Sequence, residues 1–264
     1  MTNAPAATDA IDTTALFERL SYHDLAKTID HSLLRPERDD AFIEEGIRLA
    51  AEYDVASVTV RPIDVVRAAE MLRGSDVKVG TVVGFPHGNH LTETKVFETR
   101  RALEQGAREI DMVIQIGALK AGRDEDVRAD IAAVVDVAHA GGAIVKVIFE
   151  NAYLDDDEKI RACRATEAAG ADFVKTSTGF AASGATHDDL RLMRANTSAH
   201  IAVKAAGGVR TLDALLEVMA LGVTRIGATA TKTILDDFRA RKQGAADSSA
   251  PHAGSSSSMD TGAY

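Results

Sequence analysis

The chain has 264 residues, of which 45% are hydrophobic and 27% charged, values that are ordinary for a globular protein and argue against a fibrous or disordered one. A formal net charge of −10 opposes a general affinity for nucleic acid, and the single cysteine, Cys163, excludes an internal disulfide framework. No apolar run approaches the ~20 residues of a membrane span, so we expect a cytoplasmic protein with neither a nucleic-acid nor a membrane partner.

Strand and helix patterns alternate along most of the chain. Residues 1–11 are small and polar and are expected to form a flexible arm, followed by short helices at 13–20 and 23–26. Strand-like runs then occur at 29–34, 57–60, 77–83, 109–114, 144–149, 172–175, 201–204 and 224–226. Helical periods are predicted at 42–49, 63–72, 92–105, 125–140, 156–169, 187–194, 211–221 and 232–242.

Eight strand–helix units in one domain-sized chain favour a closed (β/α)8 TIM barrel, an α/β fold of ~250 residues, over an open doubly wound sheet. No glycine-rich nucleotide loop occurs where the open sheet would need one. We assign the barrel to residues 12–243. Residues 244–264 are rich in Ser, Gly and Ala and are expected to be a flexible tail.

Two lysines end neighbouring predicted strands, where the active site of such a barrel lies. Lys175 ends the sixth strand and Lys204 the seventh. Adjacent strands lie ~4.8 Å apart, so each ammonium disfavours the charge of the other and favours one free amine. A free amine can attack a carbonyl, although both lysines could instead extend from the strand ends into solvent.

Other polar residues fall at the same end of the predicted barrel. Asp111, within an apolar strand, either transfers protons or is a structural partner for a lysine. The turns after the seventh and eighth strands, with the turn at Gly179, supply amides suited to a phosphate. Their candidate residues are Gly207, Gly208, Gly227, Thr229 and Ala230. His87, His90 and Glu93 are interpreted as a loop and helix start, so no metal or other cofactor is expected.

The sequence resembles the deoxyribose-phosphate aldolases, a family of class I aldolases with a (β/α)8 fold. The matching stretches are IDHSLLRP (29–36), GFPHG (84–88), KVFE (95–98), EIDMVIQIGALKAG (109–122), KVIFEN (146–151), ADFVKTSTGF (171–180), VKAAGGVR (203–210) and RIGAT (225–229). They occur in order over residues 29–242, and the pair KTSTGF and VKAAGGVR is highly specific.

The resemblance implies reversible cleavage of 2-deoxyribose 5-phosphate into acetaldehyde and glyceraldehyde 3-phosphate through a Schiff base on Lys175. It implies that Lys204 perturbs that lysine and that Asp111 moves protons. Asp30 would support this polar network together with Thr59, which stands where the family usually has a cysteine. The phosphate would be held by the glycine turns already named, and no metal is implied.

Several alternatives remain open in the sequence. Thr229 and Ala230 replace serines usual in the family, so an aldolase of the same fold with another aldehyde or an unphosphorylated substrate is the first. A non-catalytic barrel that binds phosphosugars is the second. Tyr264 ends a tail long enough to reach the barrel mouth and could assist proton transfer, or the tail could be idle. A homo-oligomer is compatible with the sequence, which does not specify one.

Overall fold

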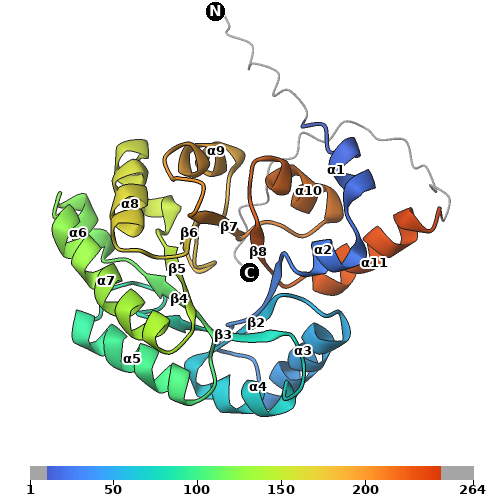
Figure 1. The fold of residues 1–264 in the computed structure, drawn as a ribbon, viewed down its shortest axis with the longest axis horizontal. Helices are drawn as coiled ribbons and strands as arrows, with labels where there is room; N and C mark the ends of the chain where they lie inside the picture. Colours follow the sequence, from blue (N-terminus) through green and yellow to red (C-terminus); the bar gives the residue numbers. More distant parts are fainter. Residues whose placement is uncertain (1–10, 245–264) are drawn as a thin grey trace, which may run out of the picture.

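The computed structural model describes residues 11–244, and these form one closed barrel of parallel strands surrounded by helices (Figure 1). The strand order is β1 to β8, with β8 closing against β1. The strands are β1 (Ile29–Leu33), β2 (Ser57–Val60), β3 (Lys78–Val83), β4 (Glu109–Val113), β5 (Ile144–Ile148), β6 (Phe173–Lys175), β7 (Ala202–Ala206) and β8 (Arg225–Ala228). The predicted (β/α)8 fold is therefore confirmed.

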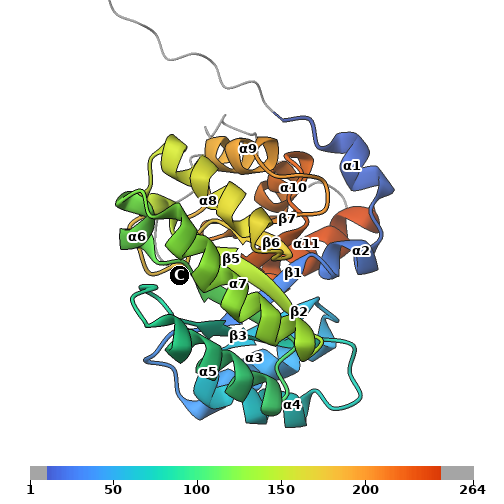
Figure 2. The ribbon, with the colours of Figure 1, turned by 60° about the vertical axis from the view of Figure 1, so that its left-hand side comes forward.

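Helices cover the outside of the barrel (Figure 2). Their buried apolar residues share one core cluster with those of the strands. The main helices are α3 (Asp40–Glu52), α4 (Val65–Met71), α5 (Thr92–Glu104), α7 (Asp124–Ala140), α8 (Asp156–Ala168), α9 (His187–Ala195), α10 (Leu212–Ala220) and α11 (Thr231–Lys242). Side-chain caps begin several of them. Asp39 accepts the Phe42 N–H at the start of α3, and Asp155 forms a capping box with Glu158 at the start of α8.

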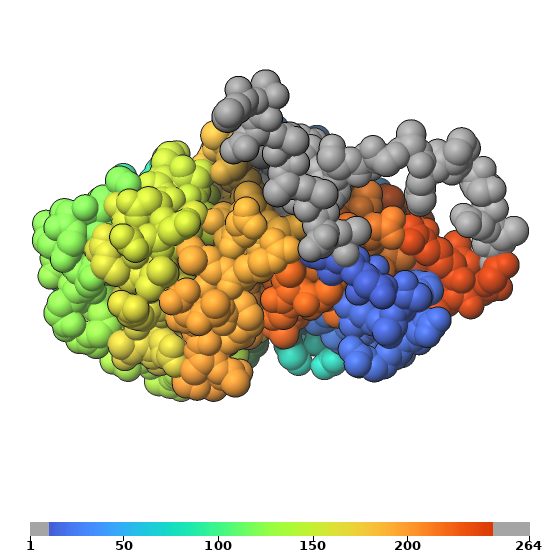
Figure 3. All heavy atoms as spheres, turned by 90° about the horizontal axis from the view of Figure 1, so that it is seen from above, coloured from blue at the N-terminus to red at the C-terminus, as the bar shows by residue number. Residues whose placement is uncertain are grey.

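Two short helices precede the barrel, α1 (Thr14–Arg19) and α2 (Tyr22–Ala26). In Figure 3 the blue N-terminal helices lie against the orange and red C-terminal part of the chain, and α1 packs on α10. After α2, Lys27 Nζ bonds to Asp54 at 2.6 Å, just before β2. The end of α2 therefore lies where the strands begin, away from the edge at which the predicted site residues gather.

The structure differs from the predicted elements mainly at the ends of strands. β7 continues to Ala206, so Lys204 lies inside this strand and does not end it. Gly227 and Ala228 belong to β8 and not to the turn after it. One short helix, α6 (Ile116–Lys120), and two 3-10 turns, η1 (Pro62–Asp64) and η2 (Asn151–Tyr153), were not predicted as separate elements. The predicted arm and tail lie almost entirely outside the described residues.

Candidate active site

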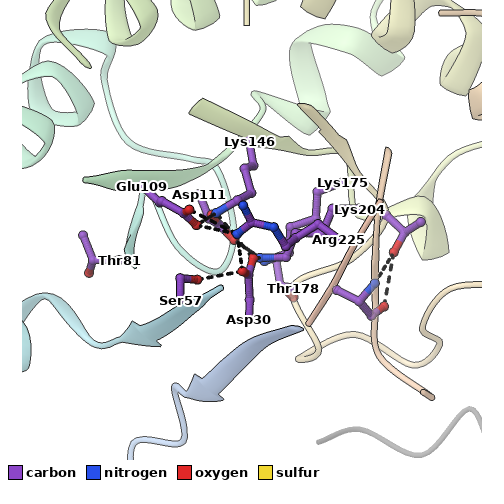
Figure 4. Close-up of polar contacts among 12 residues, drawn as sticks. Asp30, Ser57, Thr81, Glu109, Asp111, Lys146, Lys175, Thr178, Lys204 and Arg225 are labelled. Carbon is purple, nitrogen blue, oxygen red and sulfur yellow. Dashed lines mark hydrogen bonds and ion pairs between the residues drawn. The ribbon is translucent and has the colours of Figure 1, made fainter. Parts of the chain in front are cut away.

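Ionised side chains fill the interior of the barrel near its centre (Figure 4). Strand register places them side by side: Lys175 on β6 pairs with Lys204 on β7, and Asp111 on β4 pairs with Lys146 on β5. The side chains of all four residues are at most 2% exposed. Alternation along neighbouring strands has therefore brought three lysines and a carboxylate onto the inner face of the barrel at similar height.

Lys175 and Lys204 meet at one carboxylate of Asp111. Lys175 Nζ lies 2.8 Å and Lys204 Nζ 2.7 Å from Asp111 Oδ2. Lys204 Nζ also contacts Asp30 Oδ2 at 2.5 Å, whereas Asp111 is the single carboxylate within ion-pair distance of Lys175 in the described chain. The predicted proximity of the two lysines is present, and Asp111 is the group that joins them.

Lys146 is the main charged residue of the site that the sequence interpretation missed. Its ammonium contacts three carboxylates: Asp111 Oδ1 at 2.8 Å, Glu109 Oε2 at 2.6 Å and Asp30 Oδ2 at 3.4 Å. These acids raise the pKa of Lys146 above its ordinary range, although burial opposes them. Lys146 is therefore a fixed cation, and its position directly across from Asp111 in the strand register is the signal that could have identified it.

Arg225, on the strand that closes the barrel, contacts two of the acids of the cluster. Arg225 on β8 contacts Asp30 Oδ1 at 2.5 Å and Glu109 Oε2 at 3.0 Å, and Ser57 donates to Asp30 Oδ1 at 2.6 Å. Thr59 was predicted to support this polar network. It is buried in the same strand as Ser57, but its Oγ1 makes no hydrogen bond within the described residues. Ser57 occupies the place in the network that was assigned to Thr59.

The charges of the cluster set the protonation of its members. Burial alone would raise the pKa of Asp111, but the ammonium groups of Lys146, Lys175 and Lys204 hold that pKa well below its usual range. For Lys204, burial together with the charges of Lys175 and Lys146 lowers the pKa, against the opposing pull of the two aspartates. Asp111 is accordingly a stable anion, and Lys204 releases a proton more easily than an exposed lysine does.

The charge balance of the cluster also favours one free amine. Its acids are Asp30, Glu109 and Asp111, and its cations are Lys146, Lys175, Lys204 and Arg225. The cations exceed the acids by one, so loss of a single proton from a lysine makes the cluster neutral. Lys146 and Arg225 have raised pKa values, so these two cations keep their protons.

The loops after β6 and β7 touch each other through glycine backbones. A Cβ at Gly184 would lie 2.5 Å from the Gly207 carbonyl oxygen, and Gly207 itself adopts a left-handed φ of 81°. Ala185 N–H donates to the carbonyls of Ala206 and Gly207 at 3.1 Å. The Gly207 turn is thus fixed against the loop that follows Lys175, a contact that the sequence did not indicate.

The predicted phosphate residues are brought to the same end of the barrel, at or just after the ends of β6, β7 and β8. The backbone N–H groups of Gly179, Gly207 and Gly208 donate no hydrogen bond to any other described residue. Ala230 precedes α11 and provides no side-chain cap for it, and Thr229 is exposed. Gly227 lies within β8, in register with Asp30 and Ala206.

A cavity of about 360 Å³ opens at the carboxyl ends of β1, β2 and β3, and neither Lys175 nor Lys204 lines it. Val82 lines it and pairs in register with Asp111, which ties the cavity to the charged cluster. The rings of Phe85 and Phe180 meet edge to face at 5.3 Å on its wall, and Leu34 also lines the cavity. Among residues 11–244, no group of three His, Cys, Asp or Glu side chains is placed to hold a metal ion. Tyr264 lies outside the described residues.

A closed parallel barrel with a buried lysine pair inside it and a cavity at the carboxyl ends of its strands is the architecture of an enzyme. Residues 25–246 match the DeoC/LacD family aldolase, and the chain belongs to this family.

Two curated relatives and one solved structure agree with that assignment. A deoxyribose-phosphate aldolase of Rhodopirellula baltica is 48% identical over 222 residues, covering 84% of this chain and 91% of the relative. One from a Geobacillus species is 50% identical over 214 residues, covering 81% and 96%. The tetrameric deoxyribose phosphate aldolase of Aeropyrum pernix superposes with a TM-score of 0.80 at 29% identity, covering 87% of this chain and 97% of that one.

Proposed function

We propose that the protein is a class I deoxyribose-phosphate aldolase that cleaves 2-deoxyribose 5-phosphate reversibly into acetaldehyde and glyceraldehyde 3-phosphate. The observation that carries the proposal is that Lys175 and Lys204 both donate to Asp111 Oδ2 inside a barrel that matches the DeoC/LacD aldolase family. Two relatives, 48% and 50% identical in sequence, are named deoxyribose-phosphate aldolases. Lys175 is the nucleophile because it is the last residue of β6, at the carboxyl end of the barrel, whereas Lys204 lies within β7.

Cleavage begins when the free amine of Lys175 attacks C1 of the open-chain sugar and water leaves to give a protonated imine. The imine accepts the electron pair of the C2–C3 bond as that bond breaks, while the C3 hydroxyl loses its proton and becomes the aldehyde of glyceraldehyde 3-phosphate. The remaining enamine takes a proton at C2. Hydrolysis of the resulting imine releases acetaldehyde and restores the amine.

Lys204 is the residue better suited to carry these protons. Its pKa is lowered by burial and by the neighbouring lysines, so it exchanges a proton near neutral pH more readily than an ordinary lysine. Asp111 is a weak base because three lysines hold its pKa low. We therefore assign Asp111 to orienting both amines through Oδ2, with Asp30 as a second ion-pair partner of Lys204.

The phosphate is assigned to the backbone amides of Gly179, Gly207 and Gly208, which have no other acceptor among the described residues. The first turn of α11, after Thr229 and Ala230, adds further amides and the positive end of the helix dipole. Because Ala230 has no hydroxyl, binding depends on backbone groups more than it would with a serine there. An unphosphorylated substrate is the alternative that this departure keeps open.

Borohydride reduction in the presence of acetaldehyde tests the assignment. An ethyl group should be found on Lys175 by peptide mapping, with none on Lys146, Lys204 or the buried Lys95, which serve as internal controls. In parallel, the purified protein should release glyceraldehyde 3-phosphate from 2-deoxyribose 5-phosphate. A label on Lys204 would reverse the assignment of the two lysines, and faster cleavage of unphosphorylated deoxyribose would favour the alternative substrate.

We also propose a cytoplasmic homo-oligomer. The tetramer described for the Aeropyrum pernix protein supports self-association, and sedimentation analysis tests it. No helix in the described part of the chain is long and apolar enough to cross a membrane.

A further inference from the structure

Glu150, just after β5, has an unusual backbone conformation for a residue with a side chain. Its φ of 57° and ψ of 67° place it in the left-handed region, and it is only 2% exposed. Glycine or asparagine adopts this conformation at lower cost, so a glutamate there requires that its surroundings hold it. The mechanism described above does not use this buried acid.

Backbone hydrogen bonds on both sides hold Glu150 in place. The Phe149 N–H donates to the Lys175 carbonyl and the Asn151 N–H to the Thr176 carbonyl, each at 3.0 Å. The Glu150 carbonyl in turn accepts the Tyr153 N–H at 3.0 Å. Glu150 therefore lies between two backbone hydrogen bonds that join the end of β5 to the end of β6.

The side chain of Glu150 reaches across to the turn that follows Lys175. Its carboxylate accepts the hydroxyl of Thr178, and Oε2 also accepts the Thr178 N–H at 3.3 Å. The same threonine hydroxyl accepts the Phe180 N–H at 3.0 Å. Gly179 lies between these anchored residues with a left-handed φ of 85°. One carboxylate thus fixes both sides of the Gly179 peptide.

We propose that Glu150 is a positioning residue that fixes the Thr178–Gly179 turn for the substrate phosphate and so sets the preference for phosphorylated over unphosphorylated sugar. The proposal rests on the proposed function. Glu150 acts through Thr178 and does not touch the phosphate, since a carboxylate in direct contact would repel it. Thr178 donates its N–H to both carboxylate oxygens and its hydroxyl to Oε2, whereas the Gly179 N–H makes no hydrogen bond to Glu150.

The test compares kcat/KM for 2-deoxyribose 5-phosphate with kcat/KM for deoxyribose, because effects on Lys175 itself cancel in this ratio. Glu150→Ala should lower the ratio about tenfold, through a higher KM for the phosphorylated sugar. Glu150→Gln keeps an acceptor oxygen for Thr178 and should stay within about threefold of the wild type. Asp54→Ala is the matched control, since Asp54 is the other non-glycine residue with positive φ among residues 11–244 and lies before β2, at the opposite end of the barrel.

A second pair of variants keeps the test decisive if Glu150→Ala does not fold. Thr178→Val removes the hydroxyl that bonds to Glu150 and should lower the ratio, whereas Thr178→Ser keeps the hydroxyl and should restore it. A ratio unchanged in the folded Glu150 and Thr178 variants, including an equal loss on both sugars, would overturn the proposal. Failure of the wild type to cleave 2-deoxyribose 5-phosphate would instead contradict the proposed function.

Discussion

Lys175 and Lys204 donate to the same oxygen atom, Asp111 Oδ2, from directly paired positions on β6 and β7. Two ammonium groups that share one acceptor repel each other at close range, and burial removes the water that would screen them. The arrangement therefore favours the state in which one of the two is a free amine, which is the form that forms an imine.

Replacing Lys204 by leucine should move the rising limb of the pH–rate profile to higher pH. The change removes the cation that shares Asp111 Oδ2 with Lys175 and leaves three acids and three cations in the cluster, so protonating the Lys175 amine costs less free energy. Turnover at pH 7 should fall by ~10²-fold or more because a proton carrier is also lost. Initial rates between pH 6 and 10 on the folded variant check this, and an unshifted profile would contradict it.

Replacing Lys146 by methionine should lower both stability and turnover. Its three carboxylate partners would lose a buried cation, at a cost of ~3–5 kcal/mol in unfolding free energy. Lys95→Met is the control, since Lys95 is equally buried and pairs with Asp130 at 2.6 Å outside the cluster. Denaturant unfolding should show similar losses for both, whereas kcat should fall only for Lys146→Met. Equal kcat values in the two variants would remove Lys146 from the site.

His31 should make the protein less stable in mild acid. Burial lowers its pKa to about 4, whereas the unfolded chain has the ordinary value of ~6.5. The unfolded state therefore binds a proton first, and stability present above pH ~6.5 is lost as pH falls towards 4, by up to about 3 kcal/mol. His31→Gln can keep the contact to Thr231 Oγ1, now 2.9 Å from Nδ1, without titrating. Unfolding curves at pH 7 and 5 should differ less for this variant, and an equal difference would refute the assignment to His31.

Deleting residues 261–264 tests whether Tyr264 acts in the site. The truncated protein should still be trapped by borohydride on Lys175, but with lower turnover and slower deuterium exchange at the methyl group of acetaldehyde, because a proton donor to the enamine is missing. Tyr264→Phe keeps the ring and removes only the hydroxyl, so it should match the deletion. Exchange rates equal to those of the full chain in both proteins would assign Tyr264 no role.

The strands were accessible from sequence through local periodicity, the two lysines through their places at or near strand ends, and Asp111 as an acid within an apolar strand. Glu109 was not identified because it begins an apolar strand and resembles a surface charge. Lys146 lies in the middle of β5, and its carboxylate partners come from other strands, so no local pattern indicated a role for it. Arg225 becomes a partner of Asp30 only when β8 closes against β1, a contact across nearly the whole chain. The five-residue helix α6 lacks the length over which helical periodicity is recognisable. Long-range pairing, and not local pattern, determines the charged contacts of the site.

The contact between Gly184 and Gly207 restricts how the substrate range of this barrel can be altered. Any side chain at Gly184 would collide with the Gly207 backbone, and any at Gly207 would approach Gly184 Cα to 2.9 Å. Randomising either position would therefore push apart the loops after β6 and β7, the strands that carry Lys175 and Lys204. Ala182, exposed on the same loop, offers a position where new side chains can extend towards solvent without separating the two backbones.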